Sequence, residues 1–439
     1  MTTAPARRII LAPDKFKGSL TAAQVASALA AGITRTAPGA EIRQLPIADG
    51  GDGTVDAFLA AGWKNEPLSA PGPTVEPVST AYAYLPPSPG AVLGRPPHHS
   101  DAEPGTPAGE FPGASPASGT SPKVSGASAG ECEVNPAAAG GEGGSDDHTR
   151  GGTAVVELAA VVGLVKLPGG QLDPLHSSTY GLGVVIAHAL DRGVRDIVLG
   201  LGGSASTDGG AGLLQALGLR IFDADDRELP HGGAELSRAV RVDRTHLHPA
   251  LAATRFTLAS DVDNPLLGPD GAAAVYGPQK GASPEQVTNL DAALANWAKL
   301  IGPEWAEQPG AGAAGGTGFG AMAVLGATAR SGIDVVLDLI DFPAQVDGAD
   351  LVVTGEGSFD AQSLNGKAPV GVAAAAHRAG VPVTVVAGRV GLTPDQVRAA
   401  GFSDAYALSD LEPDPARSIA NAAVLLERIG AAIGERLAG

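Results

Sequence analysis

The sequence predicts an α/β protein built on parallel β-sheets, and three observations support this prediction. Short runs rich in Val, Ile and Leu alternate with amphipathic helical segments along most of the chain. The runs at 7–12, 195–200 and 381–387 contain consecutive apolar residues, as expected for strands that are covered on both faces. Ser/Thr-x-x-Gln boxes at 21–24, 283–286 and 393–396 mark helix starts. Ligands of such folds bind at the carboxyl ends of the strands.

The elements follow one another in a regular order. The N-terminal part gives a strand at 7–12, a helix from about 21 to 39, a strand at 41–48 and a helix from about 54. Order resumes at 153, with strands at 195–200 and 256–260 and helices at 212–217 and 283–300. The C-terminal third adds strands at 350–354, 381–387 and 405–408, and helices at 368–378, from 393, and at the C-terminus.

Composition excludes several classes of protein. The 439 residues carry a formal charge of −18 and no long Lys/Arg run, which disfavours binding to nucleic acid or to anionic lipid. A single cysteine, Cys132, excludes an intramolecular disulfide. No apolar stretch reaches membrane-spanning length and no signal segment opens the chain, so we expect a cytoplasmic protein.

Residues 86–152 differ from the rest of the chain. Gly, Pro, Ser and Ala dominate there, and apolar periodicity disappears. Such a segment buries too little apolar surface to offset its ordering entropy, so the sequence predicts a disordered insert. A metal site formed by His98, His99 and Cys132 is the alternative, and solvated low-complexity sequence is favoured over it.

The residues suited to chemistry lie in loops that mostly follow predicted strands. Glycines let backbone amides approach an anion, and carboxylates suit a divalent cation or a general base. Two loops near the N-terminus, at 13–19 and 48–54, hold Asp14, Lys15, Lys17, Asp49, Gly50, Gly51 and Asp52. Two in the middle, at 200–212 and 260–266, hold Gly202, Gly203, Ser204, Ser206, Thr207, Asp208, Asp261 and Asp263, and Lys280 follows. The last, at 354–369, holds Glu356, Asp360, Gln362, Gly366 and Lys367.

Single loops leave alternatives open. Each could be a turn that caps a helix, and the G-x-G-x-x-A pattern from Gly200 is a weak dinucleotide fingerprint. The glycine-rich segment at 309–320 matches G-x-G-x-x-G without a preceding strand, which predicts a flexible anion-binding loop or hinge rather than a Rossmann motif. The acid, amide and Gly-Lys of 354–369 do not form a Walker A pattern but provide groups that phosphoryl transfer requires.

Taken together, six segments resemble the class I glycerate kinase family of bacteria. In family order they are APDKFKGSL, PIADGGDGT, GLGGSASTDGGAGLLQALG, DVDNPLLGPDGAAAVYGPQKGA, PGAGAAGGTGFGAM and TGEGSFDAQSLNGKAPVGVA. The resemblance implies a phosphotransferase with an alcohol group as acceptor, which uses ATP and Mg²⁺ to convert D-glycerate to 2-phosphoglycerate rather than to 3-phosphoglycerate. It also implies a Rossmann-like α/β domain (1–80 and 275–439) interrupted by a second α/β domain (81–274), with the active site in the interdomain cleft.

Three positions depart from the family pattern. The family usually has Ser at the position of Lys15, Glu at that of Asp52, and often Arg at that of Tyr180. The first departure gives Lys17 more weight than Lys15. The shorter carboxylate of Asp52 and the missing cation at Tyr180 would alter any anion or metal contact made there.

The resemblance leads to a division of roles. Asp261, Glu356 and Asp360 are expected to hold Mg²⁺, and Lys17 and Lys367 to offset charge on the transferred group. Asp49 or Asp208 is expected to orient or deprotonate the attacking hydroxyl. The expected substrate and phosphate contacts come from Asp14, Gly50, Gly51, Asp52, Gly202, Gly203, Ser204, Ser206, Thr207, Lys280, Gln362 and Gly366.

Two other functions remain open at this point. One is a nicotinamide-dependent dehydrogenase of a small hydroxy acid, and the other is a non-catalytic binding protein on a kinase-like scaffold. The expected partners are D-glycerate and ATP, with no nucleic acid and no membrane, and a homodimer is compatible with the sequence.

Overall fold

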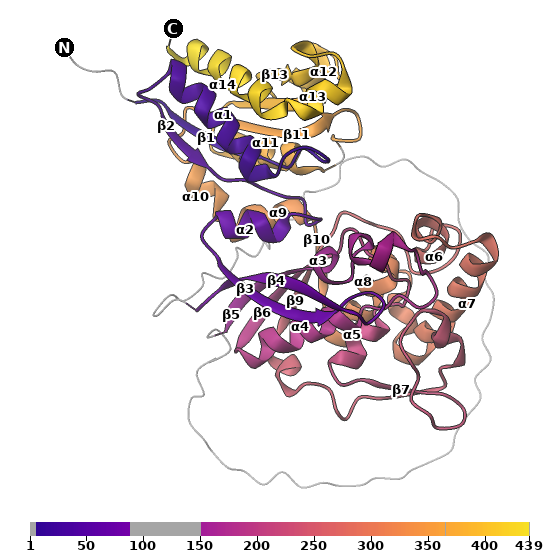
Figure 1. Cartoon of the computed structure of the whole chain (residues 1–439). Helices are drawn as coiled ribbons and strands as arrows, with labels where there is room; N and C mark the ends of the chain where they lie inside the picture. Colours follow the sequence, from indigo (N-terminus) through magenta and orange to yellow (C-terminus); the bar gives the residue numbers. More distant parts are fainter. Residues whose placement is uncertain (1–5, 88–150, 365, 439) are drawn as a thin grey trace, which may run out of the picture. The chain divides into compact units, whose positions relative to one another are not determined.

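The computed structural model describes residues 6–87, 151–364 and 366–438. Two main sheets organise this part of the chain (Figure 1). A two-stranded sheet of β7 (Arg220–Phe222) and β8 (Arg241–Asp243) accompanies them. The predicted α/β class with a predominance of parallel pairing is confirmed. The predicted insert, with His98, His99 and Cys132, lies almost entirely outside the described residues, so its disorder stays a prediction.

The first sheet is wholly parallel, in the order β13-β12-β11-β1-β2. Its strands are β1 (Arg8–Pro13), β2 (Glu41–Gln44), β11 (Leu351–Phe359), β12 (Val383–Val390) and β13 (Asp404–Ala407). Strand β1 lies between β11 and β2, and its apolar residues pack against helices on both faces of the sheet. Ile9 and Leu11 pack with α1 (Ala22–Thr36) and α14 (Ala422–Ala438), whereas Ile10 and Ala12 pack with α9 (Gly332–Leu339), α10 (Phe342–Val346) and α11 (Ala368–Arg378).

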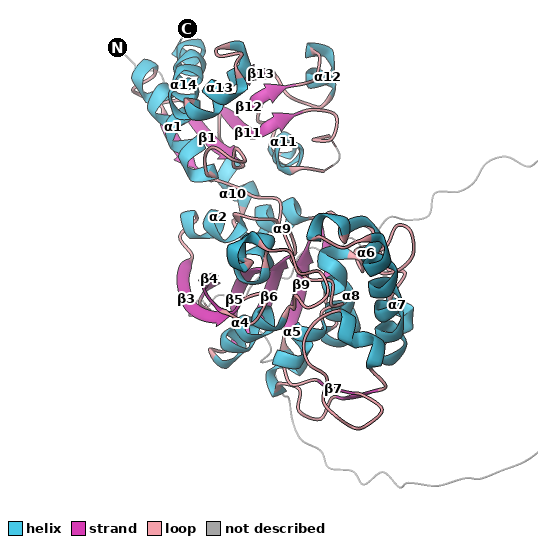
Figure 2. Cartoon of the chain, turned by 45° about the vertical axis from the view of Figure 1, so that its right-hand side comes forward, coloured by secondary structure: helices cyan, strands magenta, loops and turns pink. Residues whose placement is uncertain are grey.

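The second sheet is mixed, in the order β10-β9-β6-β5-β4-β3 (Figure 2). Its strands are β3 (Lys64–Pro71), β4 (Pro77–Leu85), β5 (Gly152–Glu157), β6 (Val194–Gly200), β9 (Arg255–Ala259) and β10 (Thr328–Arg330). The pairs β3–β4 and β4–β5 are antiparallel, and the pairs β5–β6, β6–β9 and β9–β10 are parallel. The β3–β4 hairpin is absent from the sequence prediction because prolines interrupt β3, which an edge strand tolerates.

The core beside this sheet comes from helices of both the middle and the later part of the chain. It includes Leu182, Leu214, Trp297 and Phe319. These residues belong to α4 (Tyr180–Asp191), α5 (Ala211–Ala216), α7 (Pro284–Ile301) and α8 (Ala313–Leu325). The shorter helices are α2 (Thr54–Ala60), α3 (Leu158–Val162), α6 (Ala272–Tyr276), α12 (Pro394–Ala399) and α13 (Pro415–Ala420).

All three predicted capping boxes form. Thr21, Ser283 and Thr393 each accept a hydrogen bond from the backbone of the Gln three residues later, and that Gln side chain accepts one from the cap residue's own amide. These reciprocal bonds satisfy two amides that a helix start would otherwise leave without partners. Local sequence therefore determines where α1, α7 and α12 begin.

The prediction of a flexible loop at 309–320 is wrong. Residues from Ala313 onward form the buried helix α8, whose first turn contains left-handed backbone at Ala314, Gly315 and Gly316. A Cβ on Gly320 would lie 2.5 Å from the carbonyl oxygen of Gly209, so the glycines allow close packing of α8 on the loop before α5. Close packing of α8 therefore accounts for Gly320, and anion binding by this segment stays a prediction.

Sheet membership changes between β2 and β3 and again between β10 and β11. The predicted domain boundaries at 80/81 and 274/275 stay a prediction.

Within the described ranges, every helix is too short or too polar to cross a bilayer.

Candidate active site

A pocket of about 630 Å³ gathers ionisable residues from loops that are far apart in the sequence. Three of the predicted loops contribute to it, namely those after β1, before α2 and along β11, and Gly203 contributes from the loop after β6. Seven predicted site residues line it: Asp14, Lys17, Asp49, Asp52, Gly203, Glu356 and Lys367. The structure thus brings together acids and lysines that the sequence places up to about 350 residues apart.

Asp14 lies at the acidic centre of this pocket, directly after β1. Its Oδ1 accepts a hydrogen bond of 2.6 Å from the backbone amide of Lys15. Burial raises the pKa of Asp14 to about 7, and the neighbouring carboxylates of Asp49 and Glu356 add to this rise. A carboxyl group with this pKa can take up or release a proton near neutral pH.

Glu356 and Lys367 form the second ionic feature of the pocket. Glu356 lies within β11, and its Oε2 is 3.6 Å from Nζ of Lys367 at the start of α11. Its Oε1 is buried, and none of the described residues donates a hydrogen bond to that atom. Burial raises the pKa of Glu356, while the nearby Ser363 hydroxyl and Lys367 oppose the rise.

Lys15 and Asp52 both line the pocket and form an ion pair with each other. Nζ of Lys15 is 3.1 Å from Oδ2 of Asp52 and also donates to the Asp52 carbonyl oxygen. The side chain of Asp52 is 74% exposed, so the pair faces solvent on one side. Lys17 is exposed and lines the same pocket, and it forms no ion pair with any of the described residues.

Glycines allow the 48–54 loop to fit tightly against its neighbours. Gly50 has φ +87°, and a Cβ there would lie 2.8 Å from the carbonyl oxygen of Ala259. A Cβ on Gly202 would lie 2.9 Å from Cα of Gly51. Larger residues at these positions would displace the loop that carries Asp49 and Asp52.

Asp208 has a different environment from the other acids. It is fully buried, it does not line the pocket, and Oδ2 accepts hydrogen bonds of 2.8 Å from both the backbone amide and the hydroxyl of Thr179. Ser178 and the amides of Gly210 and Gly212 donate further bonds. These bonds tie the 208–212 segment to the start of α4.

Lys280 is likewise buried, and it holds the hydroxyl-rich loop after β6. Its Nζ donates to Ser204 Oγ at 2.7 Å and to the carbonyl oxygen of Ser206. Burial lowers the pKa of Lys280 to about 7, and the charge of Asp208 opposes this shift. The hydroxyls of Ser206 and Thr207 are buried and have no partner among the described residues.

The remaining predicted residues lie outside the pocket lining. Asp261 accepts a hydrogen bond of 3.2 Å from the amide of Gly332, and burial together with Asp49 raises its pKa. Asp360 accepts from the amide of Gln362 at 2.9 Å, which lowers its pKa. Gln362 and Gly366 are exposed.

Over the ranges described, no three His, Cys, Asp or Glu side chains gather closely enough to form a metal centre on their own.

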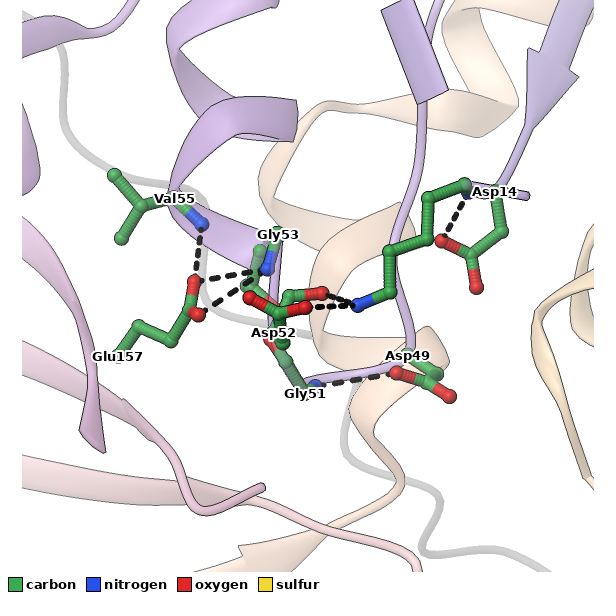
Figure 3. Close-up of polar contacts among 9 residues, drawn as sticks. Asp14, Asp49, Gly51, Asp52, Gly53, Val55 and Glu157 are labelled. Carbon is green, nitrogen blue, oxygen red and sulfur yellow. Dashed lines mark hydrogen bonds and ion pairs between the residues drawn. The ribbon is translucent and has the colours of Figure 1, made fainter. Parts of the chain in front are cut away.

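Sequence reasoning missed Glu157, a buried acid at the end of β5 whose carboxylate contacts the loop that carries Asp52 (Figure 3). The available signal was its place at the end of the TAVVE run, at the strand edge where the loops were expected to meet.

The dinucleotide alternative loses support, because a fingerprint loop opens directly into a helix, whereas here α5 begins at Ala211, nine residues after Gly202.

Comparison with known proteins assigns the chain to a family. The profile of the Glycerate kinase family matches residues 9–94 and 123–438. A glycerate kinase of Halalkalibacterium halodurans is 36% identical over 405 residues, which cover 91% of this chain and 90% of that protein. The glycerate 2-kinase of Escherichia coli K12 is 35% identical, with coverages of 87% and 85%. A crystal structure described as glycerate kinase 2 of Salmonella typhimurium LT2 superposes with a TM-score of 0.74 at 33% identity, covering 99% of this chain and 98% of that one. The chain therefore belongs to the glycerate kinase family.

Proposed function

We propose that this protein transfers a phosphoryl group from ATP to D-glycerate and forms 2-phosphoglycerate. The observation that carries the proposal is the pocket in which Asp14, Asp49 and Glu356 lie beside Lys17 and Lys367. Phosphoryl transfer depends mainly on positioning and on charge stabilisation, and this pocket provides a proton acceptor and two cations together.

The pocket also suits a nucleotide with Mg²⁺. Mg²⁺ in proteins is commonly held by one or two carboxylates together with substrate phosphates and water, so a complete protein cage is not required. The buried Oε1 of Glu356 has free lone pairs for such a cation, and Asp261 and Asp360 are the further candidates. When bound, Mg²⁺ would supply charge neutralisation on the phosphates.

The same pocket has apolar lining. Phe16, Leu408, Ile419 and Ala422 contribute to it in addition to the ionic residues. Ligand sites typically combine such apolar surface with a few polar groups, so these four residues suit the nucleoside part of ATP. Lys17 and Lys367 would then offset charge on the phosphates.

Among the carboxylates, Asp14 and Asp49 are best placed to act on the hydroxyl of glycerate. Asp14 has a pKa near neutrality, which suits proton acceptance, and Asp49 lies beside it to orient the hydroxyl. Asp208 already accepts five hydrogen bonds, so we assign it a positioning role instead. Ser204, Ser206, Thr207 and Lys280 would position the anion-binding loop that begins at Gly202.

The remaining features of the proposal follow from the family and from sheet membership. We propose a cytoplasmic enzyme with two α/β domains, one formed by 1–80 and 275–439 and the other by 81–274. D-glycerate and ATP are its partners, and a homodimer remains compatible with the sequence.

A coupled assay tests the proposed function. The protein is incubated with ATP, Mg²⁺ and D-glycerate, and the products are passed to enolase, which accepts 2-phosphoglycerate directly. Enolase-dependent formation of phosphoenolpyruvate is the expected result. A signal that requires added phosphoglycerate mutase would indicate 3-phosphoglycerate instead, and a lack of glycerate-dependent ADP would overturn the proposal.

A further inference from the structure

Glu157 is a buried carboxylate that contacts the loop at residues 48–54 from outside the pocket. It is 4% exposed and lies at the carboxyl end of β5. Its two oxygens accept hydrogen bonds of 3.2 and 3.1 Å from the amide of Gly53, and one of them accepts a bond of 3.3 Å from the amide of Val55 (Figure 3). Glu157 does not line the pocket that contains Asp14 and Glu356.

These amides have no local substitute for Glu157. Helix α2 begins after Gly53, which has φ 90° and no side chain that could cap the helix. The first amides of a helix have no partner within the helix, and leaving a buried amide unpaired is costly. Glu157 supplies the missing acceptor from a strand that lies about 100 residues later in the chain.

The segment that Glu157 holds is continuous with the residues of the pocket. Asp52 directly precedes Gly53 and pairs with Lys15, which in turn follows Asp14. On the other side, the hydroxyl of Thr54 donates to the carbonyl oxygen of Gly51 at 2.5 Å, and the amide of Gly51 donates to Asp49. A shift at residues 53–55 would therefore move both Asp49 and Asp52.

We propose that Glu157 is a positioning residue for phosphoryl transfer, which fixes Asp49 and Asp52 over the pocket by holding the backbone of residues 53–55. The proposal rests on the function proposed above. It assigns Glu157 no contact with glycerate or ATP. A displacement of about 1 Å in a catalytic group can cost on the order of 10²-fold in rate, so holding this loop has a measurable consequence.

The charge state of Glu157 gives the proposal a distinctive signature. Burial raises the pKa of Glu157 to about 7, Asp52 adds to the rise, and the two amides and Lys15 oppose it. Glu157 also lines a second cavity, of about 420 Å³, and the charged residues Asp56 and Lys166 line that cavity with it. As the pH falls through about 7, protonation weakens the carboxylate as an acceptor for Gly53 and Val55. The loop then loosens, and activity declines in addition to any decline caused by Asp14.

The test compares Glu157→Gln with the matched control Glu66→Gln. The control removes a half-buried carboxylate on β3 that pairs with Arg192. We measure kcat, both KM values and the pH profile of kcat/KM from pH 5.5 to 9. We expect Glu157→Gln to lower kcat on the order of 10²-fold with little change in KM, and to make the acidic limb less steep by one proton. Glu66→Gln should leave all three unchanged.

Hydrogen exchange provides a readout that does not require activity. Backbone amides in 48–60 should exchange faster in Glu157→Gln than in the wild type, whereas exchange in the α1 segment should be unchanged. If Glu157→Gln does not fold, Glu157→Asp replaces it. That variant keeps the charge, so it should lower kcat while retaining the full acidic limb.

The outcomes separate this inference from the proposed function. A wild-type protein that does not phosphorylate glycerate refutes the function, and hydrogen exchange then decides the positioning role. An active wild type together with a Glu157→Gln variant that keeps its kcat and its acidic limb overturns the inference. Unchanged exchange in 48–60 overturns it as well.

Discussion

Glu356 and Lys367 face each other at 3.6 Å, yet only one oxygen of the carboxylate is engaged. The other oxygen, Oε1, is buried and receives no hydrogen bond from any residue in the described ranges. A buried acceptor without a partner is unfavourable and is commonly explained by function. The pair therefore has the character of a site that is completed by a ligand rather than of a finished structural ion pair.

Replacing Lys367 by alanine should disrupt catalysis. The change removes a cation from the pocket and allows the pKa of Glu356 to rise further, because Lys367 now holds it down. Loss of one group that stabilises transition-state charge costs on the order of 10²–10³-fold in kcat. Steady-state kinetics with Lys367→Ala, Lys367→Arg and the exposed control Lys64→Ala measure this effect. A Lys367→Ala variant with the kcat of the control would contradict the assigned role.

Asp14→Asn should abolish turnover while stabilising the protein at alkaline pH. The folded-state pKa of about 7 lies above the ordinary value of 3.8, so the folded state binds more protons than the unfolded state between these values. Stability contributed by this group therefore falls as pH rises from about 4 to about 7 and stays low above that. Each pKa unit corresponds to about 1.4 kcal/mol, so the variant should gain at least about 1 kcal/mol at pH 8.

Thermal unfolding at pH 5 and at pH 8 checks this expectation. The difference in Tm between Asp14→Asn and the wild type should be larger at pH 8 than at pH 5. Asp56→Asn, at an exposed position of α2, serves as the control and should show no such dependence. An equal difference at both pH values would show that Asp14 is not held at a raised pKa.

Lys15 and Asp52 should show a small coupling. Both depart from the residues expected from the family resemblance, and the structure places them in one ion pair. Because the Asp52 side chain is largely exposed, the coupling should amount to about 0.2–1 kcal/mol. A double-mutant cycle with Lys15→Ser, Asp52→Ala and both changes, followed by denaturant unfolding, measures it. Additive effects of the two single changes would contradict the pairing.

The sequence was most informative where structure is determined locally. The capping boxes at Thr21, Ser283 and Thr393 depend on residues three positions apart, and all three form. Consecutive apolar residues predicted the parallel strands, and the rule for strand ends predicted that loops containing Asp14, Asp49 and Glu356 would meet.

The parts that the sequence did not predict depend on tertiary contacts. The 309–320 segment has the glycine content of a loop, yet its glycines allow α8 to pack closely. Asp208 looks like a catalytic acid in sequence, but its burial against Thr179 is visible only in three dimensions. Glu157 was missed because its partners, Gly53 and Val55, lie about 100 residues earlier in the chain.

Lys280→Met should alter both substrate binding and the pH dependence of stability. Burial lowers the folded-state pKa of Lys280 to about 7 from 10.5, so the unfolded state binds more protons between these values. The contribution of this group to stability therefore rises as pH increases from 7 towards 10.5, and methionine removes that slope. The change also frees the loop at Ser204 and Ser206, which should raise the KM for glycerate or for ATP.

Thermal unfolding between pH 7 and pH 10 distinguishes the buried lysine from an exposed one. The Tm of the wild type should rise relative to that of Lys280→Met across this range, whereas Lys299→Met, on the exposed face of α7, should track the wild type. Since methionine is close to lysine in volume, a loss of packing alone would shift Tm equally at every pH. Parallel Tm curves for Lys280→Met and the wild type, with an unchanged KM for both substrates, would show that Lys280 is neither neutralised by burial nor needed to hold the loop.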